Sequence, residues 1–135
     1  YRYRVVTAPV ASPFERWFVW HAPGPRDLAA MRRAAAVLVG RHDFTSFQAA
    51  GSSVPDAVRT ITRLEIVEAP GALTFEVEGD GFLRHMVRAL VGTICEIGSG
   101  SREADAMGAI LAARSRPAAG RTAPASGLTL VEVRY

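Results

Sequence analysis

Two neighbouring stretches, residues 59–68 and 72–78, constrain the fold more than any other part of the sequence. In RTITRLEIVE and ALTFEVE, apolar residues recur between charged or polar ones. The apolar positions are Ile61, Leu64 and Ile66 in the first stretch and Leu73, Phe75 and Val77 in the second. Such alternation is typical of a half-buried strand, and the Pro-Gly pair between the stretches is a turn signal. The two stretches therefore predict an antiparallel β-hairpin with one solvent-exposed face.

The remaining elements are predicted from periodicity and capping residues. Residues 1–7 suit a strand with one basic face, and the closing LTLVEVRY predicts another strand. Helices are predicted over residues 27–39, 82–97 and 102–113, the first with Asp27 as its N-cap and Gly40 as its stop. The order strand, helix, strand, strand, helix, helix, strand indicates an α+β fold, an antiparallel β-sheet with helices packed on one side. Residues 1–135 are expected to form a single domain.

The connecting segments are rich in prolines, aromatic residues and small residues. The aromatic side chains of the proline-rich segment 8–25 are expected to anchor it to the core; they are Phe14, Trp17, Phe18 and Trp20. The motif RHDFTSFQ predicts a compact turn, in which Asp43 either acts as a general base or caps the turn. Residues 48–57 are small and polar and predict a mobile loop.

Composition limits the function classes. The apolar content of 49% and charged content of 21% indicate a globular protein. The sequence has no apolar run of the ~18 residues that a membrane helix needs. The single cysteine excludes an internal disulfide framework, so a cytoplasmic protein is expected. All 16 basic residues are arginine, and the net charge is +3. Either the base composition of the genome or the binding of phosphates explains the arginines.

The predicted helix that begins DGFLRHMVRALVG carries Arg84, His85 and Arg88 among apolar residues. At ~100° per residue, the two arginines lie at the edge of the apolar arc, between packed and open surface. Either their apolar stems pack while the charged heads reach water, or each guanidinium binds an anion. The positions three and four residues from Arg88 hold no acidic residue. Its anionic partner is therefore distant in sequence or belongs to a ligand. His85 fits a structural histidine, and the scattered histidines and cysteine predict no metal site.

Five motifs, in order and spanning the whole chain, give it a resemblance to a known family. They are YRYR at 1–4, RHDFTSF at 41–47, Arg59-Thr60-Ile61, GFLRHMVRALVG at 81–92, and TAPASGLTLVEVRY at 122–135. Together they resemble the C-terminal part of the tRNA pseudouridine synthase A family. Each motif is weakly specific alone, but the ordered set is specific.

The resemblance implies an activity. Members of this family isomerise uridines in the anticodon stem-loop of tRNA to pseudouridine, using no cofactor and no metal. By motif, Tyr1 would stack on the target uracil, and Arg88 would pair with the catalytic aspartate. Leu128 would line the apolar floor of the pocket. The target base must be flipped out of its stack to enter such a pocket. The family also implies a homodimer that binds tRNA across both subunits.

The sequence differs from the family pattern in one motif, the one that carries the catalytic aspartate. The family's aspartate lies in an R-T-D-A-G-V-H type motif, which precedes the YRYR strand and is absent here. Asp43, Asp56 and Asp80 do not occupy a matching position. We therefore expect the isolated chain to be inactive as an enzyme.

Two other functions are compatible with the residues. The chain could be an RNA-binding module without catalysis, with Arg2, Arg4, Arg41, Arg59 and Arg84 as phosphate contacts. It could instead be an interaction domain whose arginines reflect genome composition. Salt-dependent RNA binding separates these two hypotheses.

Overall fold

The structure of the chain is a computed structural model that describes residues 1–51 and 54–133. The strands are β1 (Arg2–Val6), β2 (Trp20–His21), β3 (Gly40–Asp43), β4 (Val58–Ala69), β5 (Ala72–Gly79) and β6 (Leu128–Thr129). The α-helices are α1 (Leu28–Leu38), α2 (Met86–Ser99) and α3 (Met107–Ala113). Short 3-10 helices are η1 (Thr45–Phe47), η2 (Arg116–Ala118) and η3 (Ala125–Gly127).

The sheet has the order β2-β1-β5-β4-β3, and β6 also pairs with β1. The predicted hairpin is confirmed as β4 and β5, with Leu64 opposite Val77 and Ile66 opposite Phe75. β1 runs antiparallel to β5 and β6, whereas β2 runs parallel to β1 and makes the sheet mixed. Chain segments far apart in sequence therefore meet at β1.

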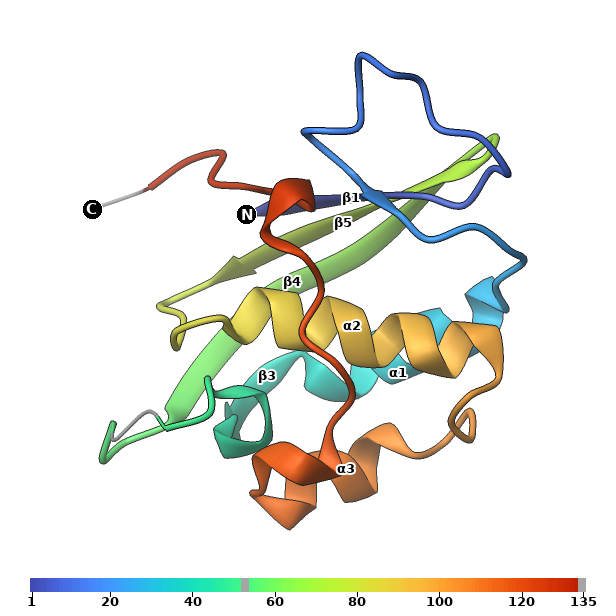
Figure 1. The fold of residues 1–135 in the computed structure, drawn as a ribbon. Coiled ribbons are helices and arrows are strands. Elements are labelled where there is room, and N and C mark those ends of the chain that lie inside the picture. The colour runs from blue at the N-terminus through green and yellow to red at the C-terminus, as the bar shows by residue number, and fades with distance from the viewer. Residues whose placement is uncertain (52–53, 134–135) are drawn as a thin grey trace.

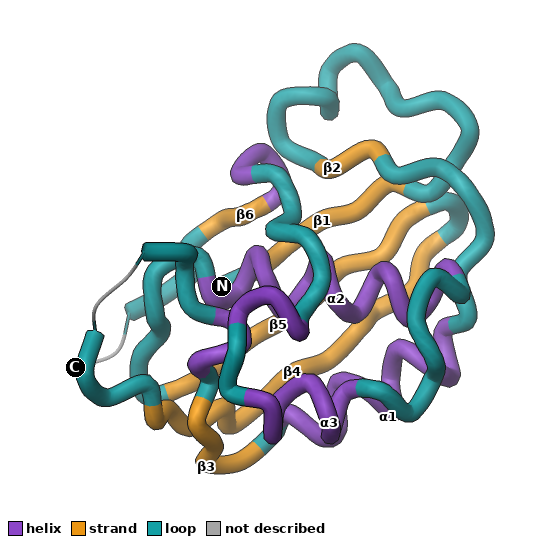
Figure 2. Tube along the Cα trace, turned by 60° about the horizontal axis from the view of Figure 1, so that its bottom comes forward, coloured by secondary structure: helices purple, strands orange, loops and turns teal. Residues whose placement is uncertain are grey.

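The three α-helices cover one face of the sheet (Figures 1 and 2). The apolar residues of β1, β4 and β5 that point toward these helices alternate along the strands and are buried, whereas Val67, on the opposite face of β4, is exposed. The largest buried strand side chains are Tyr3, Val5, Ile61 and Phe75. The α+β prediction with helices on one side is confirmed.

Local signals explain the first helix. The Asp27 carboxylate accepts a hydrogen bond from Ala30 N at 3.0 Å, so the predicted N-cap is confirmed. Helix α1 ends at Leu38, and Gly40, with φ of 110°, begins β3. The turn predicted for RHDFTSFQ consists of β3 followed by η1.

The start of the second helix differs from the prediction. α2 begins at Met86 because His85 adopts the left-handed conformation, with φ of 60°. Arg84 therefore precedes the helix, and the prediction that it shares an edge of that helix with Arg88 is wrong. The third helix is also shorter than predicted, since α3 begins at Met107. The closing strand contains only the two residues of β6 within the described residues.

The aromatic segment between β1 and β2 also differs from the prediction. Phe14, Trp17 and Phe18 are 89%, 69% and 67% exposed, so they do not anchor the segment to the core. Only Trp20 packs inward, with its ring edge-on to Tyr3. The pattern of aromatic residues alone could not distinguish these positions. The loop predicted to be mobile, 48–57, includes positions outside the described residues, and its mobility stays a prediction.

Candidate active site

Arg88 lies in the first turn of α2, beneath a segment that crosses the helix. We call this segment, residues 116–124, the strap; it links the region after α3 to η3 and β6 (Figure 1). Arg88 Nε donates to the carbonyl oxygen of Ala123 at 2.7 Å, and Ala123 N donates to the carbonyl oxygen of Arg88 at 3.0 Å. The two residues are thus joined by a reciprocal pair of hydrogen bonds.

The guanidinium of Arg88 is only partly used by these bonds. In residues 1–51 and 54–133, no carboxylate forms an ion pair with Arg88. The side chain is half-buried, so water does not surround the charge completely. Its two terminal nitrogens remain available for an anion, which is the arrangement expected of a group that binds a distant carboxylate or phosphate.

Tyr3 lies beside Arg88 and is completely buried. Its hydroxyl donates to the carbonyl oxygen of Pro124, the residue after Ala123, at 2.5 Å. Burial raises the pKa of this hydroxyl well above its ordinary value, Cys95 raises it further, and the positive charge of Arg88 opposes the rise. Tyr3 therefore stays protonated and acts as a hydrogen-bond donor that holds the strap.

Leu128 begins β6 directly opposite Tyr3 in the sheet and is half-buried. The hydrogen bonds of the strap and the pairing of β6 thus bring Arg88 and Leu128 to the neighbourhood of one buried tyrosine. Gly127 makes this packing possible, since a methyl group there would lie 2.6 Å from the Tyr3 ring.

Tyr1 lies two residues before Tyr3 and so faces the same side of the strand. Its ring packs edge-on to Phe82 at 5.2 Å between centroids, and its backbone exchanges hydrogen bonds with Val77. Tyr1 and residues 130–133 also line a hollow of about 530 Å³. Arg88 and Leu128 are not among the residues that line this hollow. In the described part of the chain, no hydrogen bond joins Tyr1 to either of them.

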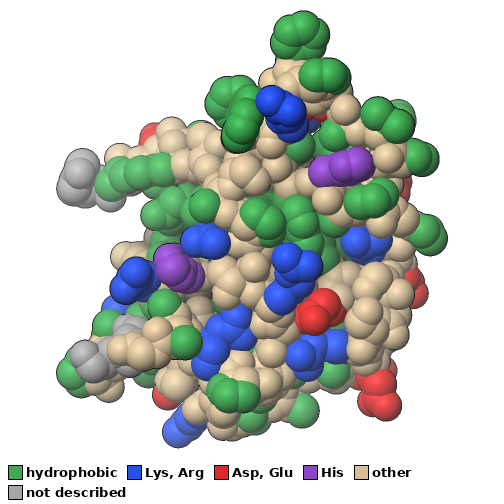
Figure 3. All heavy atoms as spheres, in the orientation of Figure 1, with side chains coloured by type: hydrophobic (Ala, Val, Ile, Leu, Met, Phe, Trp, Pro, Cys, Tyr) green, Lys and Arg blue, Asp and Glu red, His purple; other side chains and the backbone are tan. Residues whose placement is uncertain are grey.

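The five arginines predicted to contact phosphates have different surroundings. Arg4 lies 3.6 Å from the carboxylate of Glu15 and forms an ion pair with it. Arg2 forms an ion pair with Glu76 at 2.6 Å, and Arg59 donates to the carbonyl oxygens of Asp56 and Val58. Arg41 and Arg84 are exposed and form no ion pair with the residues that the structure describes. Figure 3 shows basic side chains gathered over α2 and the strap, with acidic ones among them.

Comparison with known proteins decides the family. Residues 34–135 match the family model described as tRNA pseudouridine synthase. The chain belongs to the tRNA pseudouridine synthase family. It is 47% identical over its whole length to tRNA pseudouridine synthase A of Syntrophotalea carbinolica, covering 54% of that protein. It is 51% identical over 95% of its length to the protein of the same name from Halalkalibacterium halodurans, covering 49% of that protein. The chain thus spans about half the length of the curated relatives it matches.

The three aspartates considered from the sequence have structural contacts in this family member. Asp43 accepts hydrogen bonds from the backbone and hydroxyl of Thr45, which lower the pKa of its carboxyl. Asp56 accepts from Val58 N, and Asp80 accepts from Thr60 N. None of these hydrogen bonds involves Arg88.

Two further titratable side chains, His85 and Cys95, lie on or next to α2. Burial and the charges of Arg88 and Arg84 lower the pKa of His85, which favours the neutral imidazole. Burial raises the pKa of the Cys95 thiol to about 12, which makes it unreactive. Within residues 1–51 and 54–133, no three side chains of His, Cys, Asp or Glu come together as metal ligands. None of the helices described there is long and apolar enough to span a membrane.

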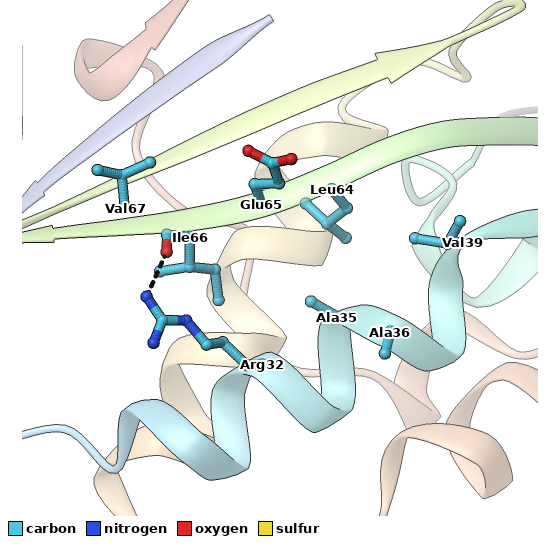
Figure 4. A pocket seen from close by; sticks show the side chains of 8 residues that line it. All are labelled: Arg32, Ala35, Ala36, Val39, Leu64, Glu65, Ile66 and Val67. Atoms are coloured by element: carbon cyan, nitrogen blue, oxygen red, sulfur yellow. Dashed lines mark hydrogen bonds between the residues drawn. The ribbon is translucent and has the colours of Figure 1, made fainter.

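A second hollow, of about 390 Å³, lies between α1 and β4 (Figure 4). Ala35 and Ala36 face it from the helix, and Leu64 and Ile66 face it from the strand. β3 pairs only with the first residues of β4. Further along β4, where β3 has ended, Arg32 donates to the carbonyl oxygen of Ile66 at 2.9 Å. The arginine satisfies a strand carbonyl beyond the end of β3, and the hollow contains none of the family's motif residues.

The sequence did not predict several members of the site. The strap, Tyr3 and Glu96 come together only in the folded chain. The available signals were two glycines. A methyl group at Gly92 would overlap the backbone of Arg121, and one at Gly120 would overlap the Glu96 carboxylate. Of the two, only Gly92 lies inside a predicted helix, where an isolated glycine can indicate close packing.

Proposed function

We propose that this chain is the C-terminal part of a catalytic region that isomerises uridine to pseudouridine in tRNA. In this reaction the bond from C1′ to N1 of the uracil breaks and a bond from C1′ to C5 forms. The proton on C5 leaves, and N1 becomes protonated. The observation that carries the proposal is Arg88, whose terminal nitrogens have no carboxylate partner within residues 1–51 and 54–133.

Arg88 would bind the catalytic aspartate supplied from outside these 135 residues. Its Nε is fixed by the carbonyl oxygen of Ala123, so the guanidinium plane has a defined direction. A bidentate pair with arginine keeps a carboxylate ionised and oriented. Tyr1 would stack on the uracil, and Leu128 would close the apolar floor. The family resemblance also supports the anticodon stem-loop as the target and a homodimer as the assembly, with no cofactor.

Tritium release tests this proposal. The full-length protein should release tritium from a tRNA transcript that carries uridine labelled at C5, because the C5 proton is lost. Arg88→Ala should lower kcat by ~10²–10³-fold, the usual effect of removing one electrostatic contact in an active site. Its affinity for tRNA should change by about threefold at most. Arg33→Ala, which removes an exposed arginine of α1, is the matched control.

Three results would contradict the proposal or a part of it. A full-length protein that releases no tritium from any tRNA transcript would exclude the activity. A loss caused by Arg88→Ala that lies mainly in tRNA affinity would assign Arg88 to phosphate binding. The isolated 135 residues should release no tritium, and release by them would show that the aspartate is among the residues of this chain.

RNA binding without catalysis is the alternative, and the exposed positions of Arg41 and Arg84 favour it. Each phosphate contact steepens the dependence of the binding constant on salt by about 0.7–0.9 in a double-logarithmic plot. Replacing either arginine by alanine should reduce the slope by about that amount. A binding constant that does not change with salt would exclude this function.

A further inference from the structure

The strap is held on α2 at points well away from Arg88. Thr93 is completely buried; its hydroxyl accepts from Gly120 N at 2.9 Å and donates to the carbonyl oxygen of Ala89 at 2.8 Å. One turn further along, Glu96 Oε2 accepts from Arg121 N at 3.3 Å. Two side chains of α2 thus hold two consecutive backbone amides of the strap.

Two arginines hold the carbonyl oxygens of the same segment. Arg102 donates to Ala118 O and Ala119 O, each at 3.0 Å, and its Nε donates to Glu96 Oε2 at 3.3 Å. Arg116, inside the strap, donates to Gly120 O at 2.7 Å. Glu96 is therefore the carboxylate that joins α2, Arg102 and the strap.

Arg88, Gly92 and Glu96 are four residues apart and share one side of the helix. Gly92 allows the strap backbone to touch the helix, because a methyl group there would overlap the carbonyl oxygen of Arg121. The strap is thus held at the Glu96 end and in close contact at Gly92. At the Arg88 end, Ala123 O accepts from Arg88 Nε and Ala123 N donates to Arg88 O, and the Tyr3 hydroxyl holds the next residue, Pro124.

We propose that Thr93 and Glu96 are positioning residues for the isomerisation. By fixing the strap over α2, they set the place of the Ala123 carbonyl, and through it the direction of the Arg88 guanidinium. A guanidinium is planar, so fixing its Nε–H bond also fixes where its terminal nitrogens point. This inference rests on the proposed function, in which those nitrogens hold the catalytic carboxylate.

Steady-state kinetics of the full-length protein provide the first test. Thr93→Val and Glu96→Ala should lower kcat at least tenfold and leave the KM for tRNA within about twofold. Thr93→Ser, which retains the hydroxyl, should keep kcat within about threefold of the wild-type value. Glu103→Gln changes an exposed acidic side chain and should have no effect.

A double-mutant cycle separates positioning from a general loss of structure. In an Arg88→Ala background, Thr93→Val and Glu96→Ala should cause no further loss of kcat, because the group they position is absent. An equal loss in both backgrounds, or a rise in KM with kcat unchanged, would overturn the inference.

Nuclear magnetic resonance of arginine Nε–H groups provides a test that does not need activity. The Arg88 signal is assigned by its loss in Arg88→Lys. In Thr93→Val and Glu96→Gln this signal should shift or broaden, whereas in Glu103→Gln it should not. An Arg88 signal unmoved in both variants would overturn the inference even if the enzyme is active. A shifted signal in a protein without activity would support the positioning and refute only the proposed function.

Discussion

The contact between Gly92 and the strap can be tested by adding a single methyl group. In Gly92→Ala the new carbon would lie 2.9 Å from the carbonyl carbon of Arg121 and 3.2 Å from Ala123 N. These are backbone atoms, so the strap as a whole must move. Overpacking of this kind costs ~1–3 kcal/mol. The movement also weakens the hydrogen bonds Ala123 N–Arg88 O and Gly120 N–Thr93 Oγ1, at ~0.5–1.5 kcal/mol each.

The helix itself gains ~1 kcal/mol when alanine replaces glycine in its interior. The net result should be a loss of about 1–5 kcal/mol in the free energy of unfolding, which near the middle of that range is roughly 10 °C in Tm. Gly108→Ala is the matched control, because Gly108 lies in α3 with no atom within 4 Å of the added methyl group. It should raise the free energy of unfolding by ~0.4–1 kcal/mol.

Urea denaturation of the wild-type protein and both variants, followed by circular dichroism, measures the two changes. If Gly92→Ala stabilised the protein as much as Gly108→Ala, the close packing of the strap on α2 would be refuted. If both variants destabilised it equally, the loss would not come from the strap.

Three further predictions follow from individual side chains. The Cys95 thiol, buried and with its pKa raised to about 12, should react with a thiol reagent at about pH 8 only after unfolding; fast labelling of the native protein would contradict its burial. The Asp43 carboxyl has a lowered pKa in the folded state, so the ionised carboxylate stabilises the folded protein. This contribution to the free energy of unfolding is fully present above the unfolded pKa of about 3.9 and is lost as the pH falls through the folded pKa. The difference in unfolding free energy between wild type and Asp43→Asn should therefore narrow from about pH 7 to about pH 2.5, and a constant difference would exclude this role. His85→Gly should raise the free energy of unfolding by up to ~1 kcal/mol, because glycine adopts a φ of 60° without strain, whereas His85→Ala should not.

The sequence predicted elements whose causes are local. The β4–β5 hairpin follows from alternation around Pro70-Gly71, and the start of α1 follows from Asp27. Both depend on contacts between residues close together in the chain. The start of α2 was predicted wrongly because the φ of His85 is a backbone state that periodicity does not reveal.

The site was predictable only in part. Arg88 was singled out because no carboxylate lies near it in the sequence, and the structure describes none paired with it in residues 1–51 and 54–133. The strap was not predicted, since the hydrogen bond between Thr93 and Gly120 joins residues 27 positions apart. The exposure of Phe14 and Trp17 was likewise decided by tertiary structure.

The position of β1 in the sheet affects how the chain folds during synthesis. The hydroxyl of Tyr3 bonds to a residue 121 positions later, and β6 pairs with the same strand. At ~5–20 residues per second, the ribosome needs roughly 6–24 s to make that stretch. The β4–β5 hairpin needs only ~1–10 μs to close once it has emerged. For those seconds the apolar face of β1, with Tyr3 and Val5, lacks β6 and the strap, so slowed translation should increase the time during which the nascent chain can aggregate.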